Sequence, residues 1–272
     1  MLVSEEYAIA QSEGAYSALI GGLSESGKIS KDEKLIARIQ RITDRVVAQA
    51  VLYRPGAKDW KWSIKIIDDP ETVNAFCMAG GKMAVYTGLI KKVQPTDDEI
   101  AQVMGHEISH ALASHQVEKM SVQLASGLAV ATVAATTASE NQGRNQNIQV
   151  MASLAAATLI ALPNSRGQES EADRLGIELA ARAGYSPHAA VTLWEKMMKE
   201  SGQTSRFDLL STHPASPKRV EALAALEEEM KPLYEMGKIS RDAERPQSLP
   251  SYKKKSGVKK IVRPYGHLSD LR

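Results

Sequence analysis

The chain is poor in cysteine and in aromatic residues. It contains one cysteine, Cys77, among 272 residues, which excludes an internal disulfide and leaves the redox compartment undetermined. Aromatic residues make up only 5% of the chain, and the residues after Met1 lack the positive start and apolar run of a secretory signal. We therefore expect either a cytoplasmic protein or one whose leader has been removed.

Charges of both signs are present, but they are unevenly distributed. The net charge is +2, whereas residues 251–272 hold seven Lys or Arg against one Asp, a net +6 that leaves −4 for the other residues. Such a tail could touch acidic lipid or nucleic acid, although most short charge runs are simply solvated. The tail lacks interleaved aromatic residues, and no phosphate-binding glycine loop is present. We expect no nucleic-acid partner, and contact with a membrane surface stays open.

The apolar pattern predicts an α+β protein that is mainly helical. Large apolar residues recur at helical spacing from Lys31 to Leu52. Three short β-type runs predict a small sheet with hairpin character, at residues 62–67, 73–78 and 82–87. Later capping signals predict four more helices. One begins after Thr96 and extends beyond His110, and the next runs from Ser165 to about Ala183. The other two run from Pro187 to about Lys199 and from Pro217 towards Met230.

Two uncharged stretches, Met120 to Ser139 and Asn145 to Ser165, are long enough to cross a bilayer. They are built mainly from Ala, Ser, Thr, Gln and Gly, which gives little energy for membrane insertion. We therefore expect a helical hairpin packed on the domain, with membrane contact as the alternative.

The segment Gly105 to His110 contains His-Glu-Ile-Ser-His, an instance of the HExxH pattern. Side chains four residues apart lie on one face of a helix, so the imidazoles of His106 and His110 can reach one ion. Zinc suits this set because it accepts neutral imidazole and carboxylate in tetrahedral geometry and leaves a position for water. Glu107 adjoins this face and is the candidate general base. An exposed polar helical turn is the alternative, which the apolar neighbours of the motif disfavour.

A catalytic zinc needs a third protein ligand, and the start of the helix after Ser165 carries acidic candidates. Glu169 and Asp173 are four residues apart and share a face, whereas Glu171 points elsewhere. We predict Glu169 as the ligand and Asp173 as an acceptor that orients a ligand imidazole. A solvated acidic patch is the alternative.

These motifs resemble metallopeptidase family forty-eight, which includes the HtpX-like, Oma-like and CAAX prenyl proteases. The similarity runs from Val73 to about Leu226. Besides HExxH, it rests on Asn74-Ala75-Phe76, Gly80-Gly81, Val85 to Leu89, Ser165 to Asp173, and Ser211-Thr212-His213-Pro214 with Arg219. The resemblance implies a zincin-like fold, one Zn²⁺ per chain and Glu169 as the third ligand. It places His213 near the active site, where it would stabilise the oxyanion or occupy the open zinc position.

The resemblance also implies a zinc-dependent endopeptidase. Zinc would activate water, and Glu107 would accept the water proton and deliver it to the leaving amine. The strand Asn74, Ala75 and Phe76 would present backbone groups to an extended polypeptide. Unfolded or membrane-associated proteins are the expected substrates, in protein quality control of a bacterial envelope, at a periplasmic or membrane-peripheral site.

Two other functions stay open. The chain could be a latent or inactive zinc-fold chaperone or binding protein whose metal is covered by a lid, or a membrane-bound processing protease. We divide the chain into an N-terminal segment over residues 1–30, a zinc metallopeptidase domain over 31–232 and a basic C-terminal extension over 233–272.

Several other polar residues carry no firm prediction. Arg166 and Arg219 could pair with Asp173 or with substrate, or form a structural salt bridge. No role is predicted for His115, His188 or His267, which match no pattern.

Overall fold

The computed structural model describes residues 2–125, 164–201, 208–214 and 216–244. The described α-helices are α1 (Glu5–Glu25), α2 (Glu33–Tyr53), α3 (Asp97–Leu112), α6 (Arg166–Arg182), α7 (His188–Ser201), α8 (Asp208–Thr212) and α9 (Pro217–Glu244), and residues 115–125 are also helical. The strands are β1 (Ser63–Ile67), β2 (Ala75–Met78) and β3 (Lys82–Tyr86), with short turns of helix at Pro55–Asp59 and Leu89–Val93. The mainly helical α+β class is thus confirmed.

The three strands form one small mixed sheet in the order β1-β3-β2. β2 and β3 are antiparallel neighbours with Phe76 opposite Ala84, and β1 runs parallel to β3 with Ile64 opposite Met83. Gly80 and Gly81, both with φ of +78°, form the turn of the β2–β3 hairpin. The predicted hairpin is confirmed, and β2 lies at the edge of the sheet.

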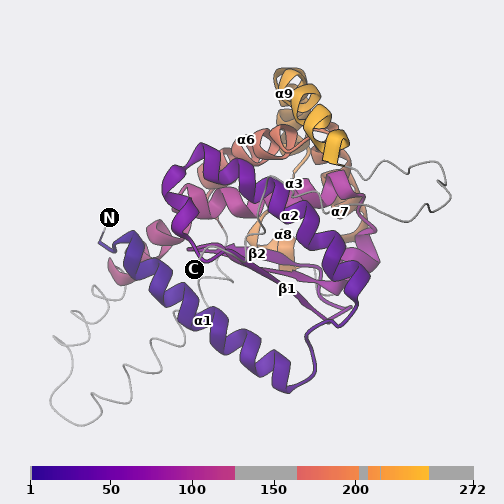
Figure 1. The fold of residues 1–272 in the computed structure, drawn as a ribbon. Helices are drawn as coiled ribbons and strands as arrows, with labels where there is room; N and C mark the ends of the chain where they lie inside the picture. The colour runs from indigo at the N-terminus through magenta and orange to yellow at the C-terminus, as the bar shows by residue number, and fades with distance from the viewer. Residues whose placement is uncertain (1, 126–163, 202–207, 215, 245–272) are drawn as a thin grey trace, which may run out of the picture.

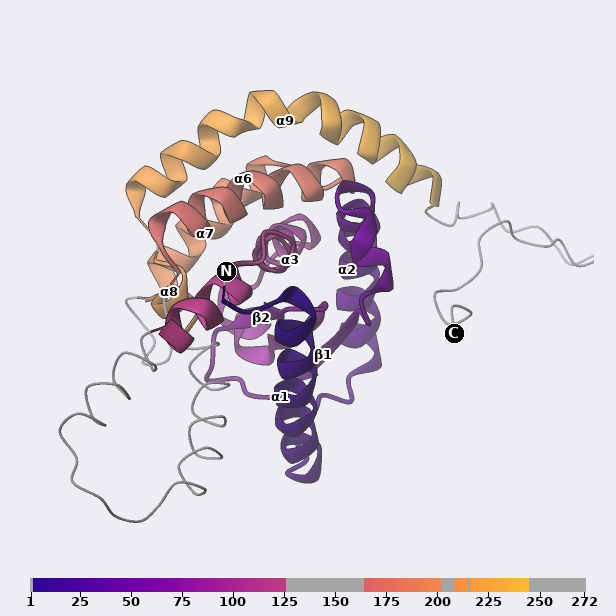
Figure 2. The same cartoon turned by 90° about the vertical axis from the view of Figure 1, so that its left-hand side faces the viewer.

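The helices lie in layers on the two faces of this sheet. In Figure 2, α9 arches over α6, α6 lies over α3, and α3 lies over the sheet, while α1 crosses the opposite face. The larger core joins α2, α3, α6 and α7 to the inner face, where Ile42, Met104 and Leu179 are fully buried. A smaller cluster joins Tyr16 of α1 to Phe76 on the outer face. Each layer therefore buries its apolar side against a neighbour.

The N-terminal segment and the C-terminal helix hold more regular structure than the sequence pattern predicts. Residues 1–30 contain the 21-residue helix α1, whose buried face is narrow, with Ala8, Ser12 and Tyr16. Helix α9 continues past Pro232 to Glu244 rather than ending near Met230. It is supported beyond the proline because Leu233 packs against the core and Gly237 lies directly against the end of α6.

Most of the predicted hairpin lies outside the described residues, which end at 125 and resume at 164. Among the described helices, none combines the length and the apolar character that a bilayer crossing requires.

A contact between two glycines fixes how α3 and α6 cross. A Cβ atom added to Gly105 would lie 2.6 Å from the carbonyl oxygen of Gly176, and one added to Gly176 would lie 2.7 Å from the amide nitrogen of His106. Only glycine leaves room for backbones this close. The crossing point lies beside His106, so it determines how far the acidic residues of α6 stand from the HExxH side chains.

Candidate active site and metal centre

Helix α3 carries the HExxH residues, and its N-terminus is held by a capping box. Thr96 caps the helix by accepting from the amide of Glu99, and the Glu99 carboxylate accepts from the amide of Thr96 at 2.8 Å, which is the predicted capping box. The same carboxylate receives the Lys196 ammonium of α7 at 2.7 Å. Helix α3 is therefore held to α7 by a charged contact as well as by apolar packing.

Four buried side chains from α3, α6 and the segment after α8 converge on one point. They are His106, His110, Glu169 and His213, and one donor atom from each lies within 4.8 Å of the others. His106 Nε2 stands 3.1 Å from His110 Nε2 and 3.5 Å from Glu169 Oε2. His110 Nε2 stands 3.3 Å from Glu169 Oε1. The structure thus brings the three predicted ligands together with His213, which lies 107 residues after His106.

These distances suit a tetrahedral metal ion. With metal–ligand bonds of about 2.0–2.2 Å, neighbouring ligand atoms of a tetrahedron stand about 3.3–3.6 Å apart. The nearest donor atoms of the three predicted ligands stand 3.1–3.5 Å apart, with Glu169 facing His106 through Oε2 and His110 through Oε1. Two imidazoles and a carboxylate are the donor types of many catalytic zinc sites. The residues present therefore fit a metal cofactor of this kind.

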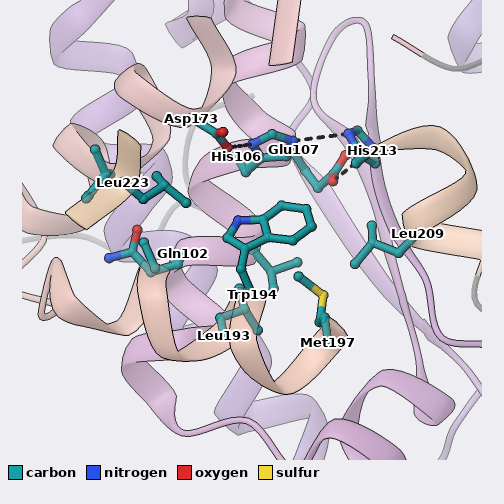
Figure 3. Close-up of a pocket in the computed structure, with 13 residues that line it drawn as sticks. Gln102, His106, Glu107, Asp173, Leu193, Trp194, Met197, Leu209, His213 and Leu223 are labelled. Carbon is teal, nitrogen blue, oxygen red and sulfur yellow. Dashed lines mark hydrogen bonds and ion pairs between the residues drawn. The ribbon is translucent and has the colours of Figure 1, made fainter. Parts of the chain in front are cut away.

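His213 supplies a fourth donor. Its Nδ1 lies 2.8 Å from Glu169 Oε1 and 3.1 Å from His106 Nε2. Its Nε2 lies 3.5 Å from Glu107 Oε1, and Figure 3 shows His213 beside His106 and Glu107. Asn164 places its side-chain amide 3.2 Å from His213 Nδ1. His213 therefore lies where a fourth ligand of a tetrahedral metal site would stand.

Asp173 orients His106 from behind. Its Oδ1 lies 3.0 Å from His106 Nδ1, so Nε2 faces the donor cluster. Arg219 grips the same carboxylate at 2.6 and 2.7 Å, contacts Glu169 Oε2 at 2.8 Å, and stacks 3.7 Å from the ring centre of Trp194. Arg219 is therefore used within the protein, in a buried ion pair. Arg166, by contrast, is exposed at the start of α6.

His115 is the functional candidate that the sequence analysis missed. It is 2% exposed, and its Nδ1 lies 2.7 Å from His110 Nδ1. Its Nε2 faces Glu171 Oε2 at 3.3 Å. Glu171 lies outside the donor cluster, as its position on the helix predicts. The available signal was a third histidine five residues after the motif, but helical spacing alone does not aim it at His110.

Burial and hydrogen bonding act in opposite directions on these groups. Burial lowers the pKa of His106, but hydrogen bonds to Asp173 and Glu169 outweigh it and raise the pKa to about 9. Burial raises the pKa of Glu169, but hydrogen bonds from His106, His110 and His213 hold it well below its usual range. Burial lowers the pKa of His110 well below its usual value. Glu169 is thus a carboxylate and His110 neutral at neutral pH, and an incoming cation competes with a proton on His106.

Glu107 stands between two pockets beside the donor cluster. It is 3% exposed, and among the described residues its Oε1 has no hydrogen-bond partner. The first pocket is lined by apolar side chains, among them Trp194, Met197 and Leu209 (Figure 3). The second lies between the centre and strand β2, with Gln116 and Lys119 in its wall. A carboxylate so placed can reach a group bound in either pocket.

Strand β2, which holds part of the predicted substrate strand, lies at the edge of the sheet and borders the second pocket. Tyr86 donates to the Asn74 carbonyl at 3.0 Å, so by the two-residue alternation Ala75 and Cys77 turn their main-chain groups towards the free edge. Phe76 lines the pocket next to the centre, whereas Asn74 and Ala75 do not. Two edge groups are already engaged, since Ala75 N donates to the Asn74 side chain and the Cys77 carbonyl accepts from Gln116 at 2.8 Å.

A comparison of the sequence with known protein families agrees with a metallopeptidase site. The model of "Peptidase family M48" matches residues 33–227. The chain belongs to this family. The match contains the whole donor cluster together with Glu107, Asp173 and Arg219, and the resemblance inferred from the motifs is confirmed.

Individual relatives are metalloproteases from several organisms. The chain is 34% identical to "Mitochondrial metalloendopeptidase OMA1" of Schizosaccharomyces pombe, over 68% of this chain and 51% of that protein. It is 36% identical to "Metalloprotease LoiP" of Escherichia coli, over 55% and 56% of the two chains. It is 28% identical to the "Beta-barrel assembly-enhancing protease" of the same organism, over 60% and 34%. The matched part spans about half or less of these relatives.

Proposed function

We propose that this chain is a zinc-dependent endopeptidase. The observation that carries the proposal is the convergence of His106, His110 and Glu169 at 3.1–3.5 Å with Glu107 beside them. Membership of Peptidase family M48 and the metalloprotease relatives support it. Zinc, when bound, would polarise the scissile carbonyl and make water a nucleophile at neutral pH.

The chain's own residues would divide the remaining work. Glu107 would accept a proton at Oε1, which has no hydrogen-bond partner among the described residues and faces His213 Nε2 at 3.5 Å, and would return it to the leaving amine. Asp173 would hold His106 with Nε2 towards the metal, and Arg219 would fix Asp173. The free edge of β2 would bind the polypeptide backbone at Ala75 and Cys77, next to Phe76. A bound peptide would take the place of Gln116 on the Cys77 carbonyl.

Zinc content and cleavage of casein, compared between wild type and Glu107→Gln, test this function. The variant should keep stoichiometric zinc and lose cleavage about 10²–10⁴-fold, since general-base catalysis contributes on this scale. Cleavage at the wild-type rate would refute the general-base assignment. A wild-type chain that binds no zinc would refute the metal centre.

A latent enzyme is the second candidate, and His213 favours it. Its Nδ1 stands in the fourth corner of the donor set, where a water would otherwise bind. Replacement of His213 by Ala should raise casein cleavage if the imidazole blocks the metal, and lower it if the imidazole stabilises the oxyanion. The two roles thus give changes of opposite sign.

The biological setting is proposed on the relatives alone. The names of these relatives place OMA1 in mitochondria and link one Escherichia coli relative to β-barrel assembly. We propose unfolded or membrane-associated proteins as substrates, in quality control of a bacterial envelope, at a periplasmic or membrane-peripheral site. Fractionation of cells and capture of substrates with the Glu107→Gln variant would test this setting.

A further inference from the structure

A chain of three polar side chains runs from the donor cluster to the surface. His110 Nδ1 lies 2.7 Å from His115 Nδ1, and His115 Nε2 lies 3.3 Å from Glu171 Oε2. His110 and His115 are both 2% exposed, whereas the Glu171 side chain is 64% exposed. The chain therefore begins at a buried imidazole and ends in solvent.

The chemistry of the three groups fixes one pattern of protons. His110 offers Nε2 to a metal only as a neutral ring with its proton on Nδ1. That proton faces His115 Nδ1, which must then accept, so the His115 proton lies on Nε2. The Glu171 carboxylate can only accept, and it faces that proton. Each of the two contacts then pairs one donor with one acceptor.

The backbone holds His115 in this position. Helix α3 ends at Leu112, and Ser114 adopts φ of +60°, a left-handed conformation uncommon for a residue other than glycine. This turn ends α3 and places His115, the first residue of the helix over residues 115–125, beside His110.

We propose that His115 and Glu171 are positioning residues for the metal ligand His110. His115 accepts from His110 Nδ1 and so fixes the tautomer and the ring angle that direct Nε2 to the metal. Glu171 in turn fixes the tautomer of His115. The inference rests on the proposed zinc centre and goes beyond it, since neither residue belongs to the donor set.

The binding of Zn²⁺ to the full chain, measured by competition with a chelator, tests the role of His115. The His115→Phe variant keeps a ring and removes the acceptor, and it should weaken zinc binding about 10–100-fold, the usual effect of removing such a partner. The His115→Asn variant should recover part of the loss, because a carboxamide oxygen can take the place of Nδ1. Zinc affinity in His115→Phe equal to that of wild type would overturn the proposal.

Co²⁺ substitution adds a readout of ligand geometry. The visible spectrum of the Co²⁺ form should change in His115→Phe and return towards wild type in His115→Asn. Two variants with equal unfolding midpoints and identical, wild-type spectra would show that His115 is only a packing residue.

A surface pair decides the question if the buried variant does not fold. Glu171→Gln removes a charge and weakens the acceptor of His115, since a carboxamide oxygen replaces a carboxylate oxygen, whereas Glu118→Gln removes a charge that acts on His115 without a hydrogen bond to it. We expect a zinc dissociation constant several-fold weaker in Glu171→Gln and unchanged in Glu118→Gln. Equal changes in the two would leave charge alone as the cause and overturn positioning. A wild-type chain that fails to bind zinc would instead refute the proposed function.

Discussion

The two imidazoles of the HExxH motif are held in different ways. His106 rests on Asp173, a buried carboxylate that Arg219 grips with two bonds of 2.6 and 2.7 Å. His110 contacts His115, which is neutral in the proposed proton pattern, and His115 in turn contacts the exposed Glu171. One support is charged and enclosed, and its loss would leave the buried Arg219 with Glu169 as its remaining carboxylate partner. The other support is the relay of weaker contacts from His110 through His115 to Glu171, and its loss should lower zinc affinity more than it lowers the stability of the fold.

The strongest test of this difference is removal of the buried carboxylate. We expect Asp173→Ala to destabilise the fold by about 3 kcal/mol, at the low end for a broken buried ion pair, because Arg219 loses the carboxylate that it holds with two bonds and keeps only Glu169. Urea unfolding in the presence of a chelator measures the effect. His115→Phe under the same conditions should cost less. Equal losses would mean that the two supports do not differ in kind.

Metal removal separates support of the ligands from support of the fold. Zinc at one hundred times its dissociation constant should stabilise the wild-type chain by about 2.7 kcal/mol. In His115→Phe at the same free zinc concentration, a tenfold loss of affinity should leave about 1.4 kcal/mol of this gain, and a hundredfold loss about 0.4 kcal/mol. Unfolding with and without chelator measures both. A zinc-dependent gain that survives in full in this variant would contradict the relay.

The glycine crossing offers a way to disturb only the His106 side. Gly176→Ala should cost about 1–3 kcal/mol through overpacking, because the new Cβ would lie 2.7 Å from the amide nitrogen of His106. Gly167→Ala is the matched control on the same helix, with its nearest neighbour 3.9 Å away. Thermal unfolding compares the two. Equal midpoints would show that α3 and α6 can separate without cost.

The smallest expected effect concerns salt. The Glu171 side chain is 64% exposed, so its influence on His115 should be screened, whereas Asp173 and Arg219 are enclosed. The ratio of zinc dissociation constants between Glu171→Gln and wild type should therefore shrink towards one when salt rises from about 0.1 to about 1 M. A ratio that stays constant would indicate a contact closed to solvent.

The sequence predicted the part of the site that follows helical repetition. The spacing of His106 and His110, the cap at Thr96 and the shared face of Glu169 and Asp173 all depend on the period of one helix. Each of these features is present in the structure. The family motifs added His213, which no period connects to the others.

What the sequence did not predict depends on changes of backbone direction and on narrow packing faces. His115 meets His110 because Ser114 turns the chain with φ of +60°, and a periodic pattern does not extend through such a turn. Helix α1 buries a narrow stripe that includes Ala8 and Ser12, which gives little apolar signal. Helix α9 passes Pro232 because tertiary packing supports it on both sides, and this outweighs local preference.

The contact between Gly105 and Gly176 also limits how this site could be changed or copied. Each glycine is required by the backbone of the other, so a larger residue at one position has no compensating substitution at the second, where no side chain is left to remove. Transfer of the histidines and acids alone to another pair of helices would leave them too far apart. The unit that must be inherited, or designed, is the crossing itself.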